Sequence, residues 1–514
     1  MEADYVVVGS GLAALSFSAL ASRAGRRVLV LEAHDKAGGY GHTFDKGRYR
    51  FDAQLHYVWN VGAERTVGRF LTQVGLTERV PFVQLDPGGY DHMRMPGWAL
   101  DVPCDFGELA RRLGALFPGH RAALTAFVDE LVATDRELEA LPSSLADAGR
   151  VLRGHGYARL IRYRSASLDD VFSRFELPRE ARALIALQWP DFLLPPKQLS
   201  FFAFVKLFAG YGRGAYYPKH HFHSVIDALL EVIRGAGGEV RFRHEVVGFV
   251  FEGDRVVGVR AERLDAHGDP TGEIEEIRGG EVVCNMDPRQ AAELIGLERF
   301  SGRLRARLTY PYSPSSFVAY LGIAGLDLRA HGVGAWNVFH ADDPDLDGIF
   351  EANHERGDYR RVSFAMSTPT LVSEAPGIAP PGHHILELLT VASHRRFHEL
   401  KLRSADAYRA EKERVFDAMM RVVERDYLPG LREHLTVTVL GSPTTNERFV
   451  RAPAGNAYGS IMTPARIWPG RLDHRSSIAG LHFCNASSGF AGFAGTIWTG
   501  ARLYEHLTGH RFLR

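Results

Sequence analysis

The amino terminus alternates between short runs of β-branched residues and a longer run of small apolar residues. Residues 5–8 read YVVV and residues 27–31 read RVLVL, and both runs are typical of buried strands. Between them, residues 12–24 are mostly alanine, leucine, serine and phenylalanine, which is typical of a helix packed on a sheet. Two strands joined by a helix predict a parallel βαβ unit, and therefore an α/β fold.

The turn before this helix has the spacing Gly9-x-Gly11-x-x-Ala14, and the second strand ends at Glu32. Gly9 permits a tight turn, Gly11 lets a pyrophosphate approach the backbone at the helix start, and Ala14 keeps helix and strand close. Glu32 can accept hydrogen bonds from the ribose hydroxyls of an adenosine. We therefore expect a Rossmann-type dinucleotide-binding domain rather than a glycine turn without a ligand.

A glycine pair, Gly38-Gly39, follows the acid in the stretch EAHDKAGGYGHTF…YRFDAQLHY, which ends at Tyr57. This stretch resembles the flavoprotein family of phytoene desaturases, carotene cis–trans isomerases and retinol saturases, which are relatives of the flavin amine oxidases. It is most similar to the saturase and isomerase branch, because the desaturase branch usually has an arginine where this chain has Tyr40. The resemblance implies that the dinucleotide is FAD.

The resemblance extends to two later segments. Residues 281–288, with the strand pair before them, resemble the return of the chain to the dinucleotide domain, and residues 480–495 resemble its carboxyl-terminal cofactor segment. A valine at the position of Val246 contacts the adenine region in the family. The residues expected to bind FAD are Gly9, Gly11, Ala14, Glu32, Lys36, Gly38, Gly39, His42, Thr43, Val246, Ser487, Gly492 and Phe493.

The chain departs from the family pattern at three places. Asn485 stands where the family has a glycine, and Ser487 stands where it usually has an acid that hydrogen-bonds the ribityl–pyrophosphate part of FAD. A serine can still make that bond, more weakly, so the resemblance implies that Ser487→Asp is tolerated. His220 and His221 replace a glycine pair. Together with His223 they lack a second cluster at metal-ligand spacing, so no metal site is expected.

His56 is the candidate catalytic residue. In the family fold, the chain after the glycine pair passes beside the isoalloxazine ring, so the resemblance places His56 near the flavin and the substrate. An imidazole there can supply or take the proton that accompanies hydride transfer. The alternative is that His56 only packs or bonds a backbone carbonyl.

Segments that resemble the cofactor domain alternate with two insertions. We expect the fold class to be α/β, with a Rossmann-type FAD-binding domain, a discontinuous mixed β-sheet substrate domain and a helical insertion. A helix is expected from about Ser404 to Glu424. The expected divisions are residues 1–90, 220–300 and 440–514 for FAD binding, 91–219 for a largely helical insertion near substrate or membrane, and 301–439 for a β-rich substrate domain.

Composition narrows the choice of partners and compartment. Hydrophobic residues make up 45% and charged residues 24% of the 514, as in an ordinary globular protein. The 61 basic and 61 acidic residues cancel, which argues against a nucleic-acid partner. Three cysteines far apart in sequence predict neither disulfides nor a metal cluster. No signal peptide and no apolar run of about 18 residues is recognised, so we expect a cytoplasmic protein.

Two stretches leave contact with a membrane open. Residues 184–217 are dense in large apolar side chains, which suits a helical core, the wall of an apolar tunnel, or a patch that takes an insoluble substrate from a bilayer. The arginines upstream can meet anionic lipid or lie on a solvated helix face. They are Arg150, Arg153, Arg159, Arg162 and Arg164.

These features predict an FAD-dependent oxidoreductase that acts on a C–C or C=C bond of a long apolar polyene or isoprenoid. Saturation, desaturation and cis–trans isomerisation all remain open, as does the electron donor or acceptor. The alternatives are a flavin amine oxidase and a flavoprotein that binds a lipophilic ligand without turnover.

Overall fold

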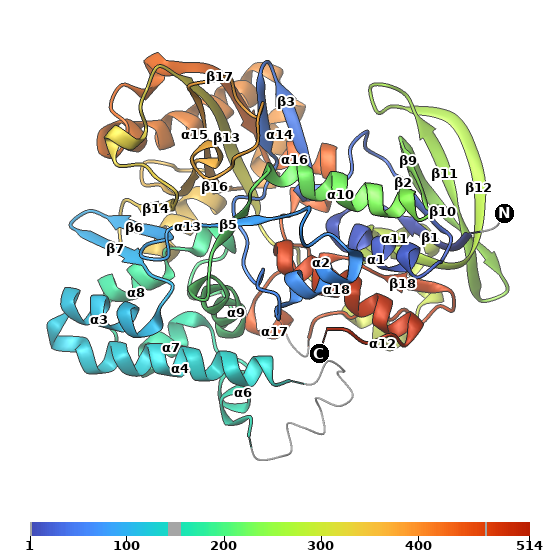
Figure 1. The fold of residues 1–514 in the computed structure, drawn as a ribbon, viewed down its shortest axis with the longest axis horizontal. Coiled ribbons are helices and arrows are strands. Elements are labelled where there is room, and N and C mark those ends of the chain that lie inside the picture. The colour runs from blue at the N-terminus through green and yellow to red at the C-terminus, as the bar shows by residue number, and fades with distance from the viewer. Residues whose placement is uncertain (1–2, 142–155, 468–469, 514) are drawn as a thin grey trace.

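The computed structural model describes residues 3–141, 156–467 and 470–513. Along its longest axis, a sheet that starts at the amino terminus lies at one end, and a second sheet and a group of helices lie at the other (Figure 1). The predicted α/β fold, with its Rossmann-type domain, mixed second sheet and helical insertion, is confirmed. The domain boundaries themselves stay a prediction.

The first sheet joins chain segments that are hundreds of residues apart. Five strands run parallel in the order β9-β2-β1-β12-β18. Their central members are buried because helices cover one face, and an antiparallel meander with one further helix covers the other. The first part of β12 continues an antiparallel β10-β11-β12 meander. The strands are β1 (Ala3–Val8), β2 (Val28–Glu32), β9 (Glu239–Phe242), β10 (His244–Glu252), β11 (Arg255–Leu264), β12 (Pro270–Cys284) and β18 (Leu481–Phe483).

Helix α1 (Leu12–Arg23) packs against the last long helix, α18 (Gly492–Thr508). The backbones approach so closely that a Cβ atom at Gly500 would lie 2.1 Å from the carbonyl oxygen of Ala13. The small residues of both helices thus bring the two ends of the chain together beside the first sheet. The other helices of this half are α2 (Thr66–Val74), α10 (His221–Gly235), α11 (Pro288–Ile295) and α12 (Gly302–Arg307).

The second sheet is mixed, because β6 and β14 run parallel and the other neighbours antiparallel. It is also discontinuous in sequence, since β6 and β7 come before the helical segment and the other strands come after it. The predicted helix near Ser404 is confirmed as α15 (Ala405–Asp426), which covers one face. In spatial order the strands are β17 (Leu435–Gly441), β13 (Ser315–Ala324), β16 (His383–Ala392), β15 (Ser363–Ser367), β14 (Asn337–Ala341), β6 (Asp91–Met95) and β7 (Trp98–Val102).

Strand alternation decides which side chains of the second sheet face the cofactor half. In β16, Leu386 and Leu388 pack with α15, whereas Ile385, Leu389 and Val391 pack in the core shared with the first sheet. Successive residues of a strand point to opposite faces, so odd-numbered positions of β16 face the cofactor half. Smaller elements of the second half are α13 (Leu346–Phe350), α14 (His394–Arg403), α16 (Pro443–Val450) and α17 (Pro464–Ile467).

The helical segment buries the apolar stretch 184–217. Phe201, Phe204 and Trp189 are almost fully buried, and no large side chain of this stretch is among the exposed ones, so the packed-core interpretation fits best. No helix in the described part of the chain is long and apolar enough to cross a bilayer. The helices are α3 (Phe106–Leu116), α4 (Arg121–Glu139), α6 (Ala158–Tyr163), α7 (Leu168–Arg174), α8 (Arg179–Ala186) and α9 (Phe201–Gly212).

Ion pairs hold part of the arginine-rich stretch against α4. Arg159 bonds both Glu130 and Glu137 of α4, at 2.9 and 3.1 Å, and Arg162 lies 3.6 Å from Glu130. These arginines therefore cross-link α6 to α4. Arg164 donates to a carbonyl of its own helix. Arg150 and Arg153 lie outside the described residues.

Candidate cofactor and active site

The turn after β1 is built around two glycines. Gly9 has a φ of +87°, which favours glycine, and its N–H donates to Leu31 O at 2.7 Å. The N–H of Gly11 donates to Asn285 Oδ1 at 3.0 Å, and a Cβ atom at Gly11 would lie 2.4 Å from that oxygen. Ala14 is fully buried, as expected for its close helix–strand contact.

The second glycine pair packs on this turn. Gly38 and Gly39 have φ values of +116° and +56°, and the Gly38 N–H donates to Ser10 O at 2.9 Å. A Cβ atom at Gly39 would lie 3.2 Å from the Cα of Gly11. We call the turns Gly9–Gly11 and Gly38–Gly39 the glycine cradle. Only residues without a side chain let the two backbones lie this close.

Glu32 lies at the end of β2, beside the cradle. Its Oε2 accepts from the backbone N–H of Ser10 at 2.8 Å and from the Ser10 hydroxyl at 2.5 Å, and its Oε1 accepts from the His34 N–H at 2.8 Å. These donors fix the orientation of the carboxylate. Its remaining lone pairs are available to ribose hydroxyls, as its predicted role requires.

Three further predicted cofactor residues hold the loop after the cradle. Lys36 Nζ donates to Thr43 O at 3.2 Å. His42 Nδ1 lies 2.6 Å from Gly39 O and must donate to it, since a carbonyl only accepts. Burial lowers the pKa of His42 to about 4, so the imidazole is neutral at physiological pH. In this structure these side chains shape the loop.

Two asparagines join the carboxyl-terminal segment to the first turn. Asn285, which follows β12, accepts from Gly11 and donates through Nδ2 to Cys484 O. Asn485 donates through Nδ2 to Asn285 O at 2.8 Å, and its Oδ1 accepts from the Ser487 N–H at 2.8 Å. We call this pair the asparagine clasp. It gives the departure at Asn485 a structural role that a glycine could not fill.

Ser487 is fully buried, and its hydroxyl is already engaged. It donates to Asp287 Oδ2 at 3.0 Å and accepts from the Ser460 N–H at 3.0 Å. The contact of Ser487 with a cofactor therefore stays a prediction, and the structure directs its side chain toward Asp287.

The remaining predicted cofactor residues come from two elements. Gly492 begins α18 with a φ of +74°, and open space surrounds the position of a Cβ atom there. Phe493 is buried, and its ring lies 5.8 Å from that of Phe222. Val246 is buried in β10. Both α1 and α18 start without a side-chain cap, which leaves backbone N–H groups to bind an anion.

His56 meets a carboxyl group from the second sheet. Its Nδ1 lies 3.0 Å from Oε2 of Glu387, which sits on β16 at an odd position and is fully buried. A carboxylate only accepts, so Nδ1 carries the proton. The Nε2 atom is buried and has no hydrogen-bond partner in residues 3–141, 156–467 and 470–513. His56 therefore presents a free lone pair, which suits a group that exchanges a proton with a ligand.

The small cavity beside His56 is lined mostly by side chains from the second sheet and the helical segment. Apolar residues form much of its wall, and the carboxyl of the half-buried Asp191 also reaches it. The lining residues are His56, Tyr57, Asp191, Asn337, Phe339, Ala365, Met366, Ser367 and Leu389.

A second buried pair lies next to this site. Asp52 accepts from the Tyr217 hydroxyl, and its Oδ1 lies 3.3 Å from Nε2 of the fully buried His221. Burial and the charge of Glu387 raise the pKa of Asp52, and burial lowers the pKa of His221 to about 3. Both shifts favour the uncharged pair, with the proton on Asp52. This gives His221, which replaces a family glycine, a packing role beside Asp52, and its Nδ1 lies within hydrogen-bond distance of His223 Nδ1 at 3.3 Å.

Four acidic residues at this site are not predicted from the sequence: Asp52, Asp91, Asp191 and Glu387. Glu387 is the single charged residue in the otherwise apolar core of HHILELLTVA, and Asp191 interrupts the apolar run LQWPDFLL. The sequence signal for such a residue is a charge inside an otherwise apolar run, because a charge that is buried with the run needs a partner.

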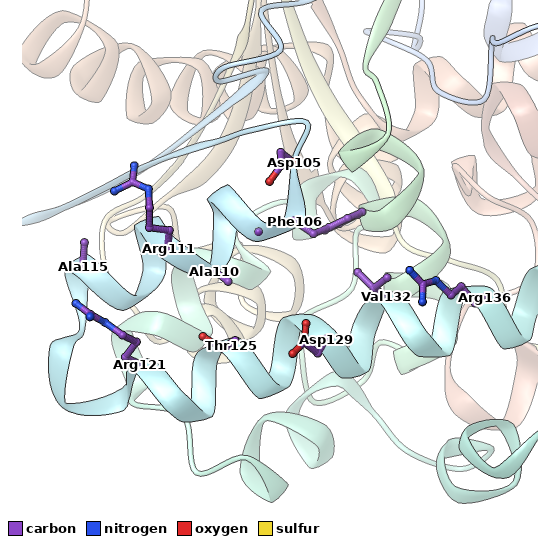
Figure 2. Close-up of a pocket in the computed structure, with 11 residues that line it drawn as sticks. Asp105, Phe106, Ala110, Arg111, Ala115, Arg121, Thr125, Asp129, Val132 and Arg136 are labelled. Atoms are coloured by element: carbon purple, nitrogen blue, oxygen red, sulfur yellow. The ribbon is translucent and has the colours of Figure 1, made fainter.

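Two other features lie apart from the predicted residues. A pocket of about 870 Å³ between α3 and α4 is lined by charged side chains including Arg111, Arg121 and Arg136, at the end opposite the first sheet (Figures 1 and 2). Among the described residues, His394, His398 and Glu447 place metal-type donor atoms within 4.8 Å of one another, on α14 and α16. His398 is exposed, and no fourth donor from the described part of the chain completes this group.

The residues present fit a dinucleotide. The cradle excludes any Cβ atom at Gly11, two uncapped helices begin beside glycines, and an oriented carboxylate ends β2. These are the parts that bind a pyrophosphate and a ribose in Rossmann-type domains.

Comparisons with known proteins agree with this geometry. Residues 7–74 match a family described as an NAD(P)-binding Rossmann-like domain. The all-trans-retinol 13,14-reductase of Danio rerio is 24% identical over 89% of this chain and 78% of its own, and that of Homo sapiens is 26% identical over 91% and 78%. Prolycopene isomerase 2 of an Oncidium hybrid cultivar is 22% identical over 96% and 81%.

Two solved structures show the same fold. An oxidoreductase from Methanosarcina mazei has a TM-score of 0.63 at 18% identity, and the alignment covers 98% of this chain and 100% of that one. A putrescine oxidase bound to putrescine has a TM-score of 0.64 at 14% identity, with 99% and 100% covered. The solved structures show the fold, and the sequence matches show that the chain is similar over most of its length to the all-trans-retinol 13,14-reductases and the prolycopene isomerases.

Proposed function

We propose that the protein is an FAD-dependent oxidoreductase that acts on a carbon–carbon bond of a long apolar polyene or isoprenoid, as a saturase, desaturase or cis–trans isomerase. The observation that carries this proposal is the placement of His56. Its free Nε2 and a largely apolar cavity wall lie together, within a chain related over most of its length to enzymes named for a retinol and a prolycopene.

Each part of the site has a task in this proposal. The glycine cradle and the uncapped helix starts bind the diphosphate, and Glu32 binds the ribose. When bound, FAD supplies the two-electron redox chemistry. Phe339, Ala365 and Leu389 exclude water from the reacting bond. Glu387 holds the proton of His56 on Nδ1, so that Nε2 is left to take up or return a proton at the substrate.

Burial disfavours charge on several groups of the site, which fits an apolar substrate. Asp52 and His221 form a neutral pair, the pKa of Asp191 is raised to about 7 by burial, and the Glu387 carboxylate is engaged by His56. We further infer a cytoplasmic location. A lipophilic substrate needs delivery from a membrane or a carrier, and contact with a membrane surface is one route.

The test is the flavin spectrum of the purified protein, reduced or oxidised anaerobically in the presence of retinol, a carotenoid or putrescine. We expect a polyene to change the flavin redox state, or to be isomerised by the reduced protein, while putrescine has no effect. Bleaching of the flavin by putrescine alone would establish amine oxidation instead. A spectrum insensitive to all three would favour a ligand-binding flavoprotein.

A further inference from the structure

A second acidic residue reaches the cavity that His56 lines. Asp191 ends the short 3-10 helix η3 (Trp189–Asp191), and Asp91 on β6 lies behind it, fully buried. The hydroxyl of Tyr57 stands between the two carboxyl groups, at 2.9 Å from Asp91 Oδ2 and 2.9 Å from Asp191 Oδ2. The mechanism above uses neither acid.

The number of protons available to Asp91, Tyr57 and Asp191 limits how many of these groups can be ionised together. The Tyr57 hydroxyl has one proton, and its oxygen already accepts from Gln188 Nε2 at 2.6 Å. Two ionised carboxylates would both need a donor from Tyr57, which can serve only one of them. The second 2.9 Å contact therefore requires a proton on one of the carboxyl groups.

The surroundings of Asp91 decide which carboxyl holds that proton. Asp91 also accepts from Gln188 Nε2 at 2.8 Å and from Asn337 Nδ2 at 3.1 Å, so donors surround it and stabilise the ionised form. Asp191 has no such set among the described residues. The consistent arrangement has Tyr57 donating to ionised Asp91, and neutral Asp191 donating its own proton to the Tyr57 oxygen.

The electrostatic environment agrees with this proton count. Burial raises the pKa of Asp191 to about 7, and burial together with the neighbouring Asp191 raises that of Asp91 well above its usual range, so the pair holds a proton at neutral pH, and the donors around Asp91 place that proton on Asp191. Two close carboxyl groups in a dry site share a proton more readily than they ionise together. The titratable groups that face this pair are His56, Tyr57, Tyr90, Cys104, Tyr211 and Tyr458.

We propose that Asp191 is a catalytic acid, held neutral by the Asp91–Tyr57 pair and placed to protonate a substrate carbon. This inference rests on the proposed function. His56, with its free lone pair, and Asp191, with its proton, then form an acid–base pair on two walls of one cavity.

The step balances when a double bond is saturated. When bound, the reduced flavin would supply a hydride, with two electrons, to one carbon. The π pair of the C=C bond takes the proton of Asp191 at the other carbon, so the O–H bond and its hydrogen bond to Tyr57 break and a C–H bond forms. The resulting carboxylate regains a proton from solvent before the next turnover.

The first test compares pH profiles of polyene turnover per bound flavin. In wild type, turnover should fall as the pH rises through about 7, because Asp191 loses its proton. Asp191→Asn keeps a donor to Tyr57 and should fold. Its turnover should be lower than that of wild type by about 10²–10⁴-fold, and the fall in turnover with rising pH should be absent. Asp406→Asn, at an exposed position of α15, should match wild type. An Asp191→Asn variant that has the turnover rate of wild type, and the same fall in turnover with rising pH, overturns the inference.

The second test does not need turnover. Infrared spectra of the flavin-loaded protein, recorded between pH 5 and pH 9, should show the C=O band of a neutral carboxylic acid that disappears near pH 7 and is absent in Asp191→Asn. If the band is present but no polyene reacts, Asp191 is neutral as inferred, but the proposed function is wrong. The catalytic step, which depends on that function, is then wrong as well. If polyenes react and the band is missing, this inference fails and the proposed function stands.

Discussion

Nδ1 of His56 lies 3.0 Å from Oε2 of Glu387, although the two residues are 331 positions apart in sequence. The first follows the loop that closes the glycine cradle, and the second comes from the middle of a strand of the other sheet. The contact therefore ties the orientation of the imidazole to the relative position of the two halves. Both partners are predicted to matter for turnover, each for a different physical reason.

Replacement of His56 by phenylalanine keeps an aromatic ring and removes the proton exchange. We expect His56→Phe to retain FAD and to lose turnover per bound flavin by about 10²–10⁴-fold, the usual worth of general acid–base help. Flavin absorbance together with a polyene turnover assay checks this. His331→Phe, at an exposed position, is the matched control. A rate within threefold of wild type would mean that His56 only packs.

Glu387→Gln tests the tautomer. An amide can donate to Nδ1, whereas a carboxylate cannot, so the variant should shift the ring proton to Nε2 and abolish the free lone pair. We expect turnover to fall by about as much as in His56→Phe, with FAD affinity within a few-fold of wild type. Nitrogen-15 NMR of labelled histidine reports the tautomer directly. An unchanged tautomer with an unchanged rate would contradict this view of the pair.

Gly11→Val tests the cradle. The added side chain starts 2.4 Å from Asn285 Oδ1 and so displaces either the asparagine or the pyrophosphate. We expect the purified variant to be colourless or to lose most of its flavin. Gly235→Ala, where no atom lies within 4 Å of the added Cβ, should keep its flavin. Full occupancy in Gly11→Val would rule out the cradle as the diphosphate site.

The structure changes what we expect at Ser487. The family pattern alone suggests that Ser487→Asp restores a lost acid. In the fold, the new carboxylate would be buried against Asp287, where two like charges meet. We therefore expect Ser487→Asp to lower thermal stability more than Ser487→Ala, which leaves one backbone donor unpaired at a cost of about 1–3 kcal/mol. Thermal unfolding and FAD titration of both variants measure their relative stability and FAD affinity. A Ser487→Asp variant that is more stable than Ser487→Ala would contradict this expectation.

His221 should make the protein sensitive to acid. Its pKa is about 3 in the folded state and about 6.5 when unfolded, so between these values the unfolded chain binds more protons. Stability is then lost as the pH falls below about 6.5, by about 1.4 kcal/mol per pH unit for this one group. In His221→Phe the slope of unfolding free energy against pH should be smaller by that amount. Urea unfolding between pH 4 and pH 7 is the measurement, and equal slopes would contradict it.

Local patterns predicted those parts of the fold that depend on neighbouring residues. The spacing of glycines with Glu32 at the end of a strand placed β1, α1 and β2, and helical spacing placed α15. The contacts of Glu387, Asp91 and Asp191 were not predictable in this way, because they depend on the pairing of segments hundreds of residues apart. A helical insertion was expected from residue 91, but its first residues form β6 and β7, which join the second sheet.

The asparagine clasp bears on how the protein is made. Gly11 bonds Asn285, and Asn485 bonds Asn285 in turn, so the clasp joins three segments that leave the ribosome far apart in time. Contacts of such sequence separation form late in folding, because a long loop must close first. During translation, the amino-terminal turn is complete long before the strand and helix that enclose it. A nascent chain that stalls before residue 480 would thus expose an open cofactor site, and chaperones or early flavin capture become relevant to its yield.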